Sequence, residues 1–163
     1  MDLEALERIK RLKYCYLRCL DQKLWDEIGD CFTEDAEASY SGGKYAFRGR
    51  DAIVAFLRRA MGAESFLSSH RVHHPEIDLT DERSATGTWA LEDVVIETRF
   101  AITIRGAAFY EDEYVLEDDG RWRIRRTGYK RTYEEIQSRK DVPGLRLTAS
   151  FWGTGGRSEL EAG

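Results

Sequence analysis

All three histidines of the chain fall between residues 70 and 74, within the string SHRVHHPEIDL. This string predicts a β-strand, in which successive side chains point to opposite faces. Ile77 and Leu79 mark the inward face, so the alternation predicts that His73 points inward and His74 outward. An inward imidazole can take or give a proton near neutral pH. The same pattern also fits a core histidine with one structural hydrogen bond, and His73 alone does not decide between them.

Two aspartates stand where an isolated carboxylate is unfavourable. Asp21 ends a predicted helix over residues 2–20, where the helix dipole disfavours negative charge, so it either caps a second short helix or has another partner. Asp93 shares a predicted strand face with Trp89 and Leu91. A carboxylate there requires a partner or keeps its proton, unless that face is solvated.

A tyrosine and an arginine extend this set. Tyr16 falls on the apolar stripe of the first helix, so its hydroxyl needs a partner. Gly128 is interpreted as a bulge that turns Tyr129 or Arg131 inward, although an arginine at such a position is more often a surface cation. Histidine, carboxylate and phenol in an apolar hollow suit enolisation, isomerisation or loss of water beside a carbonyl.

Composition excludes several classes of function. The 163 residues predict one domain, and the net charge of −5 argues against nucleic-acid or membrane partners. The chain has no phosphate-binding loop, no nucleophile elbow, no long apolar run and no signal-peptide pattern. Cys15, Cys19 and Cys31 have no histidine nearby to complete a zinc site. We interpret them as buried apolar residues in a reducing cytoplasm, and expect no metal and no cofactor.

The remaining pattern predicts the elements that position these residues. Helices are expected over 2–20, 23–31 and from Asp51 to Gly62, and a hairpin over 36–47. Long strands follow over 70–80, 84–98, 101–117 and 121–133. This order predicts an α+β fold, a cone-shaped α+β barrel with a curved, mostly antiparallel sheet wrapped around three N-terminal helices and a central pocket. Residues 1–137 form the domain, and residues 138–163 a C-terminal tail over the pocket or a subunit interface.

Six short strings, in order, resemble the SnoaL-like branch of the nuclear transport factor two-like superfamily. They are YLRCLD (16–21), SYSGGKYAF (39–47), HRVHHPEI (70–77), ATGTWALED (85–93), GAAFYEDEY (106–114) and TGYKRTYEE (127–135). Within this branch they look most like the bile acid 7α-dehydratases and, more distantly, the scytalone dehydratases.

The resemblance implies a catalytic set and a reaction. Its catalytic positions fall on Tyr16, Asp21, His73 and Asp93. We expect Arg131, Trp89 and Tyr129 to contact the substrate. The implied activity is a cofactor-independent dehydratase that removes water from a small apolar, polycyclic or steroid-like hydroxy-ketone, of steroid or polyketide type. An isomerase or cyclase of the same fold, or a non-catalytic ligand-binding module, remains the alternative. A homotrimer is expected, with a dimer as the alternative.

Overall fold

The computed structural model describes residues 2–161, which form three helices and six strands. The helices are α1 (Leu3–Gln22), α2 (Trp25–Gly29) and α3 (Arg50–Met61). The strands are β1 (Phe32–Tyr40), β2 (Tyr45–Arg48), β3 (Phe66–Leu79), β4 (Ser84–Glu97), β5 (Ile102–Leu116) and β6 (Trp122–Ser138), followed by a 3-10 turn over Arg139–Asp141. No helix among the described residues is long and apolar enough to cross a membrane.

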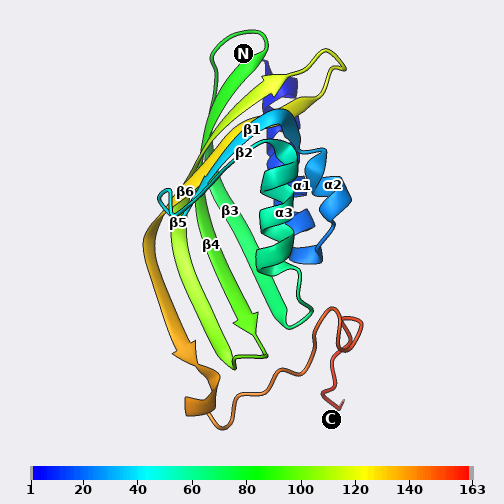
Figure 1. Cartoon of the computed structure of the whole chain (residues 1–163), viewed down its shortest axis with the longest axis vertical. Coiled ribbons are helices and arrows are strands. Elements are labelled where there is room, and N and C mark those ends of the chain that lie inside the picture. Colours follow the sequence, from blue (N-terminus) through cyan, green and yellow to red (C-terminus); the bar gives the residue numbers. More distant parts are fainter. Residues whose placement is uncertain (1, 162–163) are drawn as a thin grey trace.

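The sheet has the strand order β2-β1-β6-β5-β4-β3 and bends around the helices, which lie against its inner face (Figure 1). β1 and β6 pair in parallel, and every other neighbouring pair is antiparallel. The predicted α+β cone is confirmed, but the barrel does not close, because β2 and β3 remain edge strands. The open edge at β3 is where α1 packs against the sheet.

Helix α1 supplies much of the core. Asp2 caps its first turn by accepting a hydrogen bond from the N–H of Ala5, as the sequence predicts. Ile9, Tyr16 and Leu20 are buried under the sheet. Asp21 lies inside α1, and α2 begins after Leu24 without a side-chain cap, so capping of a second helix by Asp21 is ruled out.

A buried polar network lies between α1 and the sheet. Lys13 Nζ is 2.7 Å from Asp112 Oδ2, and both side chains are fully buried. Asp112 also accepts hydrogen bonds from Thr127 and Tyr114, and Trp89 Nε1 donates to the Tyr114 hydroxyl at 2.9 Å. Burial lowers the pKa of Lys13, against the attraction of Asp112. The network therefore satisfies charges that would be very unfavourable unpaired.

The C-terminal tail has little regular structure after the 3-10 turn and runs back across the open end of the sheet (Figure 1). Lys23 fixes it in place, with Nζ 4.3 Å from the centre of the Trp152 ring. The same Nζ donates to the carbonyl oxygens of Met61 and Phe66. The tail thus packs near the ends of α1 and α3 and the start of β3. Residues 162 and 163 lie outside the described part of the chain.

Candidate active site

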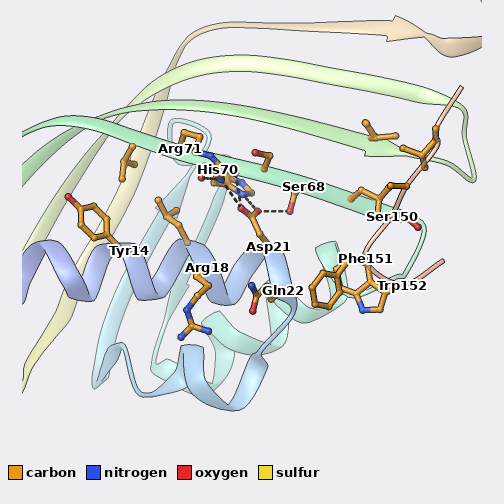
Figure 2. Close-up of a pocket in the computed structure, with 17 residues that line it drawn as sticks. Tyr14, Arg18, Asp21, Gln22, Ser68, His70, Arg71, Ser150, Phe151 and Trp152 are labelled. Carbon is orange, nitrogen blue, oxygen red and sulfur yellow. Dashed lines mark hydrogen bonds and ion pairs between the residues drawn. The ribbon is translucent and has the colours of Figure 1, made fainter. Parts of the chain in front are cut away.

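A histidine–aspartate pair joins strand β3 to helix α1. His70 Nδ1 lies 2.7 Å from Asp21 Oδ1, which also accepts from Ser68 Oγ at 2.8 Å (Figure 2). Asp21 Oδ2 accepts from the backbone N–H of His70 at 2.9 Å. Because a carboxylate only accepts, Nδ1 of a neutral His70 must carry the proton. The lone pair of Nε2 is then available as a base.

The prediction that His73 points inward is wrong. His73 pairs with Ala90 and Glu76 with Thr88, so β3 contains one extra residue between these pairs. This bulge, where His74 has a φ of 48°, reverses the alternation counted back from Ile77. The His73 side chain is 45% exposed, and Nε2 lies 3.6 Å from Glu92 on the outer face. His70 occupies the inward position instead.

An apolar cavity of about 340 Å³ lies between the inner face of the sheet, α1 and α3. Its volume is within the range of roughly 300–1,000 Å³ typical of small-molecule sites. Many of its walls are aromatic, and it is lined by Tyr16, Leu20, Tyr40, Tyr45, Phe56, Leu57, Ala60, Met61, Phe66, His70, Leu91, Asp93, Val95, Ile104, Tyr110, Tyr129, Arg131 and Glu134.

Four of the predicted residues line this cavity directly: Tyr16, Asp93, Tyr129 and Arg131. Asp21 reaches it through His70. The Tyr16 hydroxyl is 3.1 Å from that of Tyr40, a partner that the sequence analysis missed. Burial raises the pKa of both phenols, so they are neutral hydrogen-bond donors.

Asp93 and Arg131 form a two-pronged ion pair across the cavity wall. Arg131 donates to both carboxylate oxygens, at 3.0 Å to Oδ2 and through a short contact to Oδ1. Burial opposes the charge of Arg131, but the hydrogen bonds and attraction of Asp93 raise the pKa of its guanidinium overall. The expectation that a carboxylate on this face needs a partner is confirmed.

The bulge that turns Arg131 inward is not at Gly128. Glu113 pairs with Arg126 and Tyr114 with Ile124, so the extra residue is Arg125. Gly128 has a different role, because a Cβ there would lie 2.6 Å from the Ser39 carbonyl oxygen. The glycine therefore permits the close parallel pairing of β1 and β6.

Trp89 does not line the cavity, contrary to its predicted contact with the substrate. It is on the inward face of β4, as predicted, but it lies beyond Leu91, at the end of the cavity. There its ring is fully buried and its indole N–H donates to Tyr114. Trp89 is thus part of the packed core and of the buried polar network.

A second depression, of about 590 Å³, follows the edge of β3 between α1 and the tail (Figure 2). Its lining includes Asp21, Arg71 and, from the tail, Phe151 and Trp152. His70 lines both this groove and the cavity, so the histidine–aspartate pair separates the two. The tail covers this groove, and none of its described residues lines the cavity.

Comparison with known proteins adds a family and a set of related folds. A model of the SnoaL-like domain family matches residues 1–128. A candidate scytalone dehydratase from Novosphingobium aromaticivorans has a TM-score of 0.75 at 24% identity, with 97% of each chain covered. A type 2 hexachlorocyclohexane dehydrochlorinase (LinA) has a TM-score of 0.76 at 16% identity, over 89% of this chain and 93% of its own. At these identities the likeness shows the fold, and nearness to bile acid 7α-dehydratase stays a prediction.

Proposed function

Because the chain belongs to the SnoaL-like domain family, we propose that it is a cofactor-independent lyase acting on a small apolar hydroxy-ketone. The reaction is removal of water, and the preferred skeleton is polycyclic or steroid-like. The observation that carries this proposal is the His70–Asp21 pair beside an aromatic-lined cavity. Two structural relatives, a candidate dehydratase and a dehydrochlorinase, are named for elimination reactions, which supports this reaction class for the chain.

In the proposed reaction His70 is the base. Nε2 takes a proton from the carbon next to the carbonyl, and Asp21 stabilises the resulting imidazolium through Nδ1. The electrons of the broken C–H bond form the enolate. Its oxygen accepts a hydrogen bond from the Tyr16–Tyr40 pair, in which one phenol donates to the other and the second keeps its proton free for the substrate. The enolate then expels the hydroxyl group from the adjacent carbon, and the imidazolium returns its proton to it, so that water leaves.

The ion pair places hydrogen-bond donors of Arg131 in the cavity wall near the base, because Asp93 is the cross-strand neighbour of His70. Arg131 stabilises the departing hydroxyl, and Asp93 fixes the guanidinium plane by binding two of its nitrogens. Gly106 makes room for this arrangement, because a Cβ there would lie 2.6 Å from an Arg131 nitrogen. The proposed steps move only protons and a hydroxyl group, so they involve no oxidant or reductant.

The test uses two histidines of one strand. Hydroxy-ketones of steroid and aromatic type are screened for products lighter by one water, and the active compound is used for variants. His70→Ala should lower kcat by about 10²–10⁴-fold, the usual contribution of one proton-transfer group. His73→Ala is the matched control, since its exposed ring lies outside the cavity, and it should retain activity.

Three results would reject the proposal. His70→Ala with unchanged turnover would remove the base. A product with the mass of the substrate would indicate an isomerase. Binding of the compounds without any product would indicate a ligand-binding module.

A further inference from the structure

The cysteines gather on the side of α1 that faces α2. Cys15 and Cys19 are one helical turn apart, and their Sγ atoms are 3.9 Å from each other. A carboxylate oxygen of Glu27, on α2, lies within 4.8 Å of both sulfur atoms. Cys31 follows α2 and its Sγ lies 3.8 Å from the Glu27 carbonyl oxygen. Two thiols therefore meet the Glu27 carboxylate, and the third lies beside the backbone of the same residue.

The spacing of these atoms matches a tetrahedral thiolate site. With Zn–S bonds of about 2.3 Å, two sulfurs at tetrahedral corners lie about 3.8 Å apart. A carboxylate oxygen at about 2.0 Å from the same ion would lie about 3.5 Å from each sulfur. The observed sulfur spacing needs almost no adjustment, and the Glu27 carboxylate, half exposed, needs a small side-chain rotation.

We propose that Cys15, Cys19 and Glu27 bind a thiophilic divalent cation such as Zn²⁺, with water as the fourth ligand. Thiolate ligands select ions of this kind over Mg²⁺ or Ca²⁺. Binding forms two metal–sulfur bonds and releases the two thiol protons to water, so no oxidant or reductant is involved.

The surroundings support the site in two ways. Arg18 donates to Glu27 at 2.9 Å and lies 3.7 Å from Cys15 Sγ, so it orients the carboxylate towards the sulfurs. A depression of about 300 Å³ gives an ion access from solvent, and its lining includes Cys15, Glu27 and Cys31 together with Arg8 and Arg11. These arginines offset the negative charge of two thiolates and a carboxylate.

The bound ion would fasten α2 to α1. Tyr16 and Leu20, on the same helix, line the cavity, whereas Cys15 and Cys19 belong to the α2 side. The site is therefore separate from the proposed catalytic groups. Its expected effect is on stability, because an ion that binds only the folded chain favours that state.

The experiment titrates the reduced full-length protein with Cd²⁺ and follows the near-ultraviolet thiolate-to-cadmium absorption. The absorption should saturate at a single ion per chain, and Zn²⁺ should compete with it. Cys15→Ser and Glu27→Gln should each weaken binding by at least about 10-fold. Asp30→Asn is the matched control, because Asp30 lines the same depression without belonging to the ligand cluster, and it should bind normally.

Thermal unfolding gives a second readout. Zn²⁺ should raise the melting temperature of the wild type and leave that of Cys15→Ser unchanged. Cys15 is preferred over the buried Cys19 for this test because its partly exposed side chain is replaced with less disturbance. Absorption that does not saturate, equal affinity in Cys15→Ser and wild type, or equal affinity of the urea-unfolded chain would each overturn the proposal.

Discussion

Replacing Asp21 by Asn tests whether the carboxylate sets the proton position on His70. The amide has one oxygen and one NH₂ group in place of two acceptors. Its oxygen must face the backbone N–H of His70, which can only donate and lies 2.9 Å from Oδ2 in the wild type. The NH₂ group then occupies the place of Oδ1, 2.7 Å from Nδ1, and donates to it. The ring proton is therefore forced onto Nε2, and the base is lost.

The expected loss of kcat/KM is about 10⁴-fold, which is the size seen when a histidine base is held in the wrong tautomer. This corresponds to about 5 kcal/mol of activation free energy. Stability should change by less than about 1 kcal/mol, because Ser68 can rotate its hydroxyl to accept from the new amide and no hydrogen bond is lost. The double variant Asp21→Asn/His70→Ala should be no slower than His70→Ala, since both changes remove one function.

Nitrogen NMR of the His70 ring provides a readout that needs no substrate. The wild-type ring should carry its proton on Nδ1 when neutral, and the Asp21→Asn ring on Nε2. Ser68→Ala is the control, since it removes one hydrogen bond to Asp21 without changing what Nδ1 faces, and its tautomer should be that of the wild type. A wild-type ring protonated on Nε2, or an Asp21→Asn enzyme within about threefold of wild type, would refute the reasoning.

The remaining predictions concern stability and assembly. Lys13→Met should lower the free energy of unfolding by about 3–5 kcal/mol by leaving Asp112 buried and unpaired, and Lys13→Met/Asp112→Asn should recover part of this in urea denaturation; an additive double variant would contradict the pairing. Above about pH 10 stability should fall, by up to about 1.4 kcal/mol per pH unit for each tyrosine with a raised pKa, because the unfolded chain releases the proton first. The contribution of Lys13 to this pH dependence has the opposite sign. Because its pKa is lowered in the folded chain, it makes stability rise with pH, but only up to the pKa of the unfolded chain at about 10.4. Denaturation midpoints that are flat from about pH 9 to 11 would contradict burial of these phenols: Tyr16, Tyr40, Tyr110 and Tyr114. We also propose a homotrimer that uses the outer sheet face around the exposed Phe109, so Phe109→Asp should reduce the mass measured by light scattering, and a monomeric wild type would exclude it.

The sequence predicts the elements well where alternation is uninterrupted. Strand β4 contains no extra residue of its own, and Trp89, Leu91 and Asp93 all face inward as their spacing indicates. The need of Asp93 for a partner also follows from its apolar face. The identity of that partner does not, because Arg131 reaches it only through the pairing of β4, β5 and β6.

Alternation fails where a strand has an extra residue. In β3 the bulge between His73 and Glu76 exchanges the two faces, so the imidazole chosen by counting from Ile77 is the wrong one. Pro75 indicates this bulge in the sequence, since proline in a strand is largely confined to edges and bulges. The contact between Asp21 and His70 joins residues far apart in the chain, and no local spacing predicts it.

The hydrogen bond from the His70 backbone to Asp21 has a further consequence for the rim of the sheet. Unpaired N–H groups on an outermost strand invite a strand from another molecule to add on. Here the inward carboxylate occupies one of them in the middle of β3. The residue proposed to orient the base therefore also blocks the addition of a foreign strand at the β3 edge. Asp21→Ala should show this as aggregation on storage, independently of any lost turnover.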